Sequence, residues 1–186
     1  ITGLDLFPEF TNIFNRNVKQ SDLSDRVKGI VGSMDDLPFG KESLDLIWSE
    51  GAIANIGFKK GLNYWNGFLK KDGYVALTYE SWFTDDRPVE IEKFWLDAVP
   101  EMNTISHNIS VLQKAGYRLV AAFTLPETCW TEHYFSPCSK IQDEFLKKHT
   151  GSKTAEELIA GQRHEKVLYD KYKEFYGYVF YIGKKI

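Results

Sequence analysis

An aspartate at the end of a short apolar strand is the residue of this chain with the clearest chemistry. Asp5 stands near the end of the segment 2–6, and Pro8 opens the helix that is expected next. A carboxylate in this place can accept hydrogen bonds from both hydroxyls of a ribose, as it does in dinucleotide-binding α/β domains. Asp5 therefore predicts a ligand that contains a nucleoside. The alternative is an aspartate that only caps the following helix.

Further acids and aromatic residues stand where later strands are expected to end. Glu50 follows the apolar segment 44–49, and Tyr79, Glu80 and Trp82 lie at the end of the segment 74–80. In open α/β sheets, ligands gather at the carboxyl ends of the strands. We therefore expect all four side chains beside bound ligands, with the last three as pocket walls. The alternative for Glu50 is a carboxylate that caps a helix or pairs with a lysine.

An aromatic segment follows the next expected strand. Residues 127–135 contain three aromatic side chains, Trp130, Tyr134 and Phe135, together with His133. Aromatic faces can hold a cation, and the histidine could take a proton from a nucleophile. Trp130, His133 and Tyr134 are therefore candidates for a substrate pocket. The alternative is an aromatic core cluster with a structural histidine.

The apolar pattern alternates between strand-like and helix-like periods along the chain. The expected strands are 2–6, 27–32, 44–49, 74–80, 117–125 and 178–183. Helices are expected from residue 8 and over 58–69, 88–99, 109–114, 140–149 and 154–175. The nearly continuous apolar run 44–49 is typical of a parallel strand covered on both faces. This order predicts one α/β domain over residues 1–186 with a mostly parallel sheet, in which 126–176 form a helical insertion.

Composition excludes several kinds of protein. The chain has 186 residues, 43% of them hydrophobic, with a net charge of −3. This charge is wrong for a nucleic-acid binder, and no apolar run is long enough for a membrane span. The two cysteines have no metal-binding or disulfide spacing, which favours free thiols in the cytoplasm. Cys129, Glu132 and His133 lack a fourth ligand at recognisable spacing, so we expect no metal.

An ordered set of motifs resembles one enzyme family. Asp35-Asp36-Leu37-Pro38-Phe39 precedes Ser43-Leu44-Asp45-Leu46-Ile47, and Phe68–Val75 and Leu112–Tyr117 follow in the order that the family shows. The chain resembles the class I S-adenosylmethionine-dependent methyltransferases over about residues 1–125. The resemblance implies a Rossmann-like sheet with helices on both faces and an antiparallel last strand. The family's glycine-rich motif is absent, so we expect the first strand and its glycine loop to be missing.

The resemblance also implies roles for individual residues. S-adenosylmethionine would donate its methyl group to a small-molecule acceptor by in-line displacement, leaving S-adenosylhomocysteine. Asp5 would hold the ribose, and the adenine would contact Leu6, Met34 and Asp35. Ser33 stands where many relatives have an acid. Glu50 and His133 are the predicted catalytic residues, Glu50 also lies near the cofactor, and the acceptor pocket under the helical insertion 126–176 would comprise Tyr79, Trp82, Trp130, His133 and Tyr134.

Two other functions stay open at this point. A nicotinamide-dependent oxidoreductase uses the same acid after its second strand, so Asp5 alone does not choose the cofactor. A methyltransferase fold can also serve as a binding module without activity. An unpaired first strand would favour pairing with a second copy of the chain, which predicts a homo-oligomer.

Overall fold

Residues 1–186 are all described by the computed structural model, and they form two separate sheets. The first sheet holds two parallel strands joined by a helix: β1 (Thr2–Asp5), α1 (Pro8–Gln20) and β2 (Lys28–Val31). Asn15 of α1 exchanges two hydrogen bonds with the backbone of Gly29, at 2.7 and 3.0 Å. A Cβ on Gly29 would lie only 2.8 Å from the Phe14 ring, which is too close for a real contact. The helix can therefore dock this closely only over a glycine.

The second sheet carries the C-terminal part of the fold. Its strands run in the order β3-β4-β7-β6, and β5 pairs with β4. The members are β3 (Leu44–Ser49), β4 (Leu69–Trp82), β5 (Asn103–Thr104), β6 (Tyr117–Thr124) and β7 (Tyr176–Lys185). β3 pairs in parallel with β4, whereas β7 is antiparallel to both β4 and β6. The predicted antiparallel last strand is therefore confirmed.

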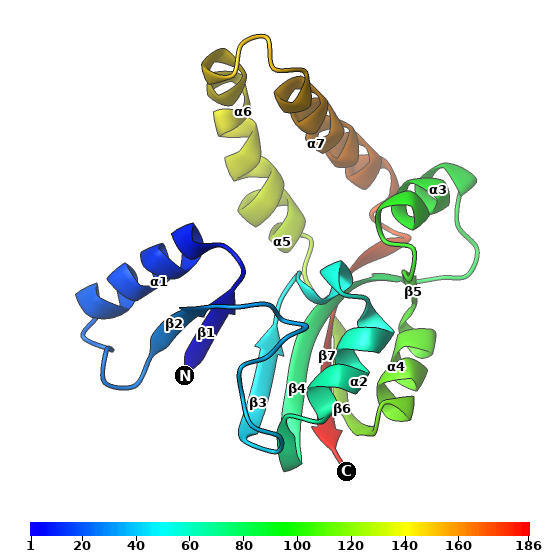
Figure 1. Ribbon diagram of the computed structural model, residues 1–186. Coiled ribbons are helices and arrows are strands. Elements are labelled where there is room, and N and C mark those ends of the chain that lie inside the picture. The colour runs from blue at the N-terminus through cyan, green and yellow to red at the C-terminus, as the bar shows by residue number, and fades with distance from the viewer.

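The edges of the two sheets that face each other are unpaired. β1 bonds only to β2 and β3 only to β4, and Figure 1 shows β1 and β3 side by side without a strand between them. Trp48 and Leu46 of β3 are 61% and 48% exposed. The expectation that β3 is covered on both faces is wrong, because the face to which these two alternate side chains point is left largely exposed.

Helices cover the second sheet and build two cores. α2 (Phe58–Asn66) and α4 (Ile105–Lys114) pack on one face, over a core that includes Leu62, Leu77 and Tyr181. The second core is aromatic, lies at the end where β4 finishes and β7 begins, and is closed by α3 (Val89–Ala98). A short 3-10 turn, η1 (Ile53–Asn55), precedes α2.

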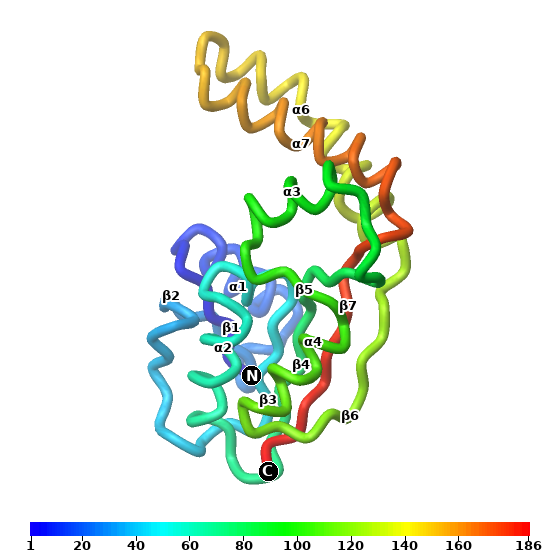
Figure 2. The backbone as a smooth tube through the Cα atoms, turned by 90° about the vertical axis from the view of Figure 1, so that its right-hand side faces the viewer, coloured from blue at the N-terminus to red at the C-terminus, as the bar shows by residue number.

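The segment between β6 and β7 is almost entirely helical. It contains α5 (Thr128–Trp130), the π-helical turn η2 (Thr131–Phe135), α6 (Ser136–Lys148) and α7 (Lys153–Tyr172). Figure 2 shows α6 and α7 projecting from the sheet as a pair. The aromatic segment after β6 is therefore part of a helical run, and α6 begins four residues earlier than the expected residue 140.

One expected turn lies inside a strand. The sequence predicts a helix over 58–69 that closes at Gly73, but α2 ends at Asn66 and β4 already begins at Leu69. The pairing with β3 shifts register here: Leu44 faces Leu69, whereas Leu46 faces Tyr74. Asp72, not Gly73, adopts the positive φ of +66°. The extra residues form an irregularity in the strand, which the helical pattern could not indicate.

Candidate functional site

Asp5 ends β1 and is already engaged in the local backbone. Its Oδ1 accepts a hydrogen bond of 2.8 Å from the Phe7 backbone N–H. This bond supports the chain where it turns into α1, as the capping alternative requires. The side chain is only half-buried, and no hydrogen bond uses its second oxygen, Oδ2. Asp5 can therefore cap the turn and bind a ligand at the same time. Leu6 beside it is 60% exposed.

The loop after β2 is ordered by its own side chains. Ser33 Oγ donates to Asp35 Oδ1 at 2.5 Å, and Lys60 Nζ lies 3.4 Å from Asp35 Oδ2. The Ser33 hydrogen bond, followed by that from Lys60, lowers the pKa of Asp35 below its usual range. The Met34 carbonyl accepts a bond of 2.8 Å from Trp65 Nε1 of α2. These contacts fix the three residues that the resemblance assigns to adenine or its surroundings.

Glu50 lies in the turn after β3 and is exposed. The Trp48 indole Nε1 donates to its Oε1 at 2.5 Å. The next residue, Gly51, has a φ of +58°, and its backbone N–H donates to Thr78 Oγ1 of β4 at 2.8 Å. This hydrogen bond fixes the turn to β4, and Glu50 lies at the carboxyl end of β3.

Alternation along β4 separates the three residues that were predicted to line a pocket together. Tyr79 faces α2, where its ring stacks on Phe58 at 4.5 Å, and it is only 1% exposed. Glu80 and Trp82 point to the opposite face. There Trp82 joins the aromatic core and contacts Tyr176, with ring centroids 5.9 Å apart. The structure therefore places Tyr79 in the first core, away from its two predicted partners.

Glu80 contacts a residue that sequence reasoning did not single out. The Tyr178 hydroxyl of β7 donates to Glu80 Oε1 at 2.7 Å. Burial and the charge of Glu80 raise the pKa of Tyr178 above its usual value. The two residues are 98 positions apart in the sequence, so no local pattern could have paired them.

The aromatic segment after β6 is divided between core and surface. Trp130 is 4% exposed and stacks on Tyr178 and on Tyr169, at centroid distances of 4.9 and 5.1 Å. Tyr134 is half-buried; its hydroxyl donates to Glu165 Oε2 of α7 at 3.3 Å, and burial raises its pKa to about 12. His133 is exposed. Of the three predicted pocket residues, only Tyr134 combines access to solvent with a carboxylate partner.

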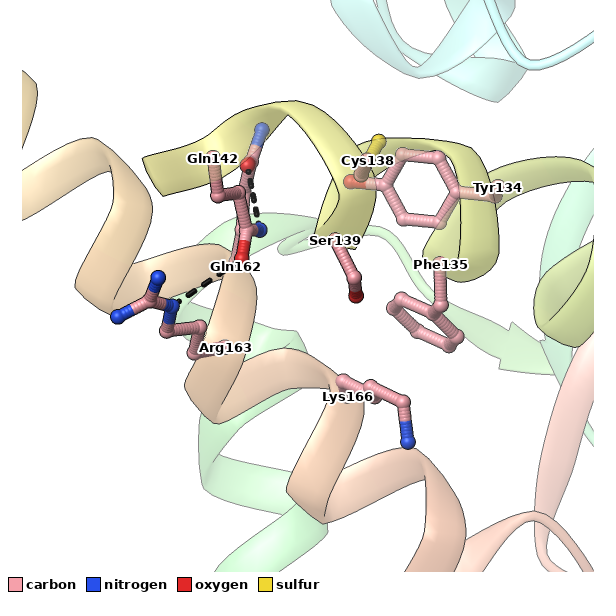
Figure 3. Close-up of a pocket in the computed structure, with 8 residues that line it drawn as sticks. All are labelled: Tyr134, Phe135, Cys138, Ser139, Gln142, Gln162, Arg163 and Lys166. Carbon is pink, nitrogen blue, oxygen red and sulfur yellow. Dashed lines mark hydrogen bonds between the residues drawn. The ribbon is translucent and has the colours of Figure 1, made fainter. Parts of the chain in front are cut away.

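Two hollows lie close to these elements. The first, of about 100 Å³, lies between α6 and α7 and is lined by Tyr134, Cys138, Lys166 and five other residues (Figure 3). The second, of about 250 Å³, lies between α2 and α4 and includes Glu101, His107 and Asn108. Neither is lined by Asp5, Asp35 or Glu50. Asp35 and Glu50 are exposed, and Asp5 is half-buried at the end of β1.

The structure was compared with the requirements of a metal site and of a membrane-spanning helix. The structure contains no group of three or more His, Cys, Asp or Glu side chains that could hold a metal ion. None of its helices has both the length and the apolar composition needed to cross a bilayer.

Comparison with known proteins identifies the fold to which this arrangement of strands belongs. Residues 1–77 match the family model described as a methyltransferase domain. A methyltransferase from Geobacter sulfurreducens, solved with S-adenosylhomocysteine, superposes with a TM-score of 0.81 at 17% identity, over 100% of this chain and 75% of its own. The chain has the class I methyltransferase fold. The resemblance and the α/β fold class predicted from the sequence are confirmed.

Two further structures show the same methyltransferase fold. One, from Thiobacillus denitrificans, was also solved with S-adenosylhomocysteine and gives a TM-score of 0.80 at 18% identity, covering 100% of this chain and 75% of that one. The other, from Galdieria sulphuraria, is described as a sarcosine dimethylglycine methyltransferase and gives 0.71 at 20% identity, with coverages of 100% and 69%. The chain thus spans about two thirds to three quarters of these relatives. No curated protein sequence matches it.

Proposed function

We propose that this chain transfers a methyl group from S-adenosylmethionine to a small-molecule acceptor. The observation that carries the proposal is the match of residues 1–77 to the methyltransferase domain, since this segment contains Asp5 and the 33–35 loop. Solved relatives with the same fold hold S-adenosylhomocysteine, which supports the choice of cofactor.

The residues of this segment suit an adenosine. Asp5 Oδ2 is available for a ribose hydroxyl while Oδ1 holds the Phe7 N–H. Asp35 is kept ionised by Ser33 and Lys60, and Leu6 offers an exposed apolar surface for a base. S-adenosylmethionine supplies a methyl group that is already activated by the sulfonium. The protein's task is therefore alignment, which contributes on the order of 7–11 kcal/mol when the reacting atoms are held in line.

The helical segment 126–176 is the proposed cover of the acceptor site. It carries Trp130, His133 and Tyr134 and enters and leaves the sheet at the end where β4 finishes. In open α/β sheets this end receives the ligand. We assign the acceptor to this side, with Glu50 at its margin. His133, exposed at the start of the segment, is the proposed proton acceptor.

Isothermal titration with S-adenosylhomocysteine tests the proposal. A saturable heat with this ligand, and none with NAD⁺ or NADP⁺, is the expected result. Methyl transfer from labelled S-adenosylmethionine to a mixed panel of amines, alcohols, thiols and carboxylates then reports activity. Binding of a nicotinamide cofactor instead would contradict the proposal and favour the oxidoreductase, whereas cofactor binding without any turnover would favour a binding module.

A further inference from the structure

Two glutamates from distant parts of the chain are each bonded to a tyrosine that packs against the second core. Glu80 ends β4, and Glu165 lies in the middle of α7. Glu80 is 7% exposed and Glu165 is half-buried. Burial raises the pKa of Glu165 above its usual range.

Neither carboxylate has a positive partner in the chain. Twelve ion pairs occur in the structure, and none of them includes Glu80 or Glu165. The neighbouring Lys166 is bound elsewhere, since its Nζ pairs with Asp170 at 2.6 Å. A buried carboxylate without a counter-charge is costly, so such a pair calls for a proton or for a cation from outside the chain.

Hydroxyl groups hold both carboxylates in place. Tyr178 donates to Glu80 at 2.7 Å, and Tyr134 donates to Glu165 at 3.3 Å. The Trp130 ring contacts both tyrosines, with centroids 6.2 Å from Tyr134 and 4.9 Å from Tyr178, so the two hydroxyls and the two carboxylates form one cluster. Burial, followed by the charge of Glu80, raises the pKa of Tyr178. Trp130 stacks on Tyr178, and its buried indole Nε1 has no hydrogen-bond partner, which leaves a donor unused beside the cluster.

The cluster stands on the ligand side of the sheet. Tyr178 OH lies 3.5 Å from the position that a Cβ on Gly51 would occupy, in the turn after β3. Glu80 itself lies two residues before the end of β4. The carboxyl ends of parallel strands are the usual ligand position in this type of sheet, so the uncompensated charge is located where an acceptor would bind.

We propose that the methyl acceptor is an amine, bound as its ammonium between Glu80 and Glu165 and oriented by Tyr134 and Tyr178. This proposal rests on the proposed methyltransferase function and names the chemistry of its acceptor. An ammonium donates charge-assisted hydrogen bonds to both carboxylates and removes their mutual repulsion. An alcohol has only one O–H to donate and leaves both charges uncompensated, and a carboxylate would add a third negative charge.

The reaction balances with groups already named. With an amine acceptor, Glu165 takes the role of proton acceptor that was proposed for His133. The ammonium gives one proton to Glu165, whose raised pKa makes it a stronger base than an exposed glutamate. The neutral nitrogen then attacks the methyl carbon with its lone pair, so that the C–N bond forms as the C–S bond breaks. The bonding pair goes to sulfur, S-adenosylhomocysteine leaves as a neutral thioether, and the proton on Glu165 passes to water.

The test compares amine binding in three isosteric variants of the full chain. Glu80→Gln and Glu165→Gln remove one charge each, and Glu174→Gln removes an exposed charge just after α7 as a matched control. Benzylamine is titrated in the presence of saturating S-adenosylhomocysteine, with benzyl alcohol and benzoate as neutral and anionic probes. Of the three probes, we expect only benzylamine to bind. Its affinity should be at least about tenfold weaker in the two glutamate variants and within about twofold of the parent in the control.

Cofactor titrations separate the two proposals. S-adenosylhomocysteine should bind all four proteins equally, because the proposal assigns both carboxylates to the acceptor and neither to the cofactor. If it binds but benzylamine shows no advantage over benzyl alcohol, or no loss in either glutamate variant, the amine proposal is overturned and the methyltransferase proposal stands. If the variants weaken S-adenosylmethionine but not S-adenosylhomocysteine, the carboxylates serve the sulfonium and the amine proposal is again overturned. If S-adenosylhomocysteine fails to bind the unmodified chain, the proposed function itself is contradicted.

Discussion

Replacing Asp5 with asparagine separates the two tasks that the structure gives this carboxylate. Oδ1 holds the Phe7 N–H at 2.8 Å, and Oδ2 is the oxygen available for the ribose. Asparagine keeps an oxygen for Phe7 but presents an amide donor in place of Oδ2. Alanine removes both. The asparagine variant therefore tests cofactor binding alone, whereas the alanine variant also disturbs the turn into α1.

The expected losses follow from the bonds removed. A hydrogen bond to a charged group contributes about 1.5–3 kcal/mol, so Asp5→Asn should weaken S-adenosylhomocysteine roughly 10- to 150-fold. Its thermal unfolding midpoint should stay close to that of the parent. Asp5→Ala should bind no better and should also lose about 0.5–1 kcal/mol of stability with the turn bond.

Calorimetric titration and thermal unfolding of the same samples provide the measurement. Asp25→Asn is the matched control, because it removes an equal charge from an exposed residue in the loop between α1 and β2. Affinity within twofold of the parent in Asp5→Asn would refute the ribose assignment. An equal fall in stability for the asparagine and alanine variants would refute the assignment of Oδ1 to the Phe7 N–H and of Oδ2 to the ribose.

Three further predictions concern stability and titration. Ser33→Ala should raise the pKa of Asp35 toward that of an ordinary aspartate, because it removes the strongest hydrogen bond to that carboxylate; a carbon-detected NMR titration with an unchanged midpoint would contradict this. Burial raises the pKa of Glu165, so the native state holds a proton that the unfolded chain has released, and stability falls as pH rises from the usual glutamate range through the raised value. The difference in thermal unfolding midpoint, Glu165→Gln minus parent, should therefore increase as the pH is raised from about 4 to about 7. A difference that does not change with pH would contradict this prediction. Gly57→Ala should cost about 1–3 kcal/mol in chemical denaturation, because Gly57 has a φ of +88°. Gly161→Ala, in open space on α7, is its control and should stabilise by roughly 0.5–1 kcal/mol; similar values for both would refute the strain argument.

Local patterns accounted for much of the scaffold. Pro8 at the start of α1, the apolar run of β3 and the glycine that follows α4 are signals of a few neighbouring residues. α1 begins, β3 runs and α4 ends where they predicted, although α4 begins four residues before the expected residue 109. The boundary between α2 and β4 was wrong for a reason that no local pattern contains. β4 begins inside a segment with helical composition because pairing with β3 extends it across an irregularity at 70–73, and strand pairing is not a local property.

The candidate site divides in the same way. Asp5 and Asp35 are both held by residues two positions away, Phe7 and Ser33, so their surroundings could be inferred from short motifs. Tyr79 was grouped with Glu80 because both end one strand. The two-residue period of a strand sends them to opposite faces, and the core under α2 takes Tyr79.

The sequence by itself determined the class of fold, the family that it resembles and the acid at the end of β1, because each depends on residue types at short spacing. Only the tertiary structure decided that Glu80 meets Tyr178 across 98 positions and that Glu165 meets Tyr134 across 31. It also decided that Glu80 is buried and Glu165 half-buried without a cation from the chain. Burial and charge compensation depend on what packs around a side chain, and that environment comes from strands and helices far away along the chain.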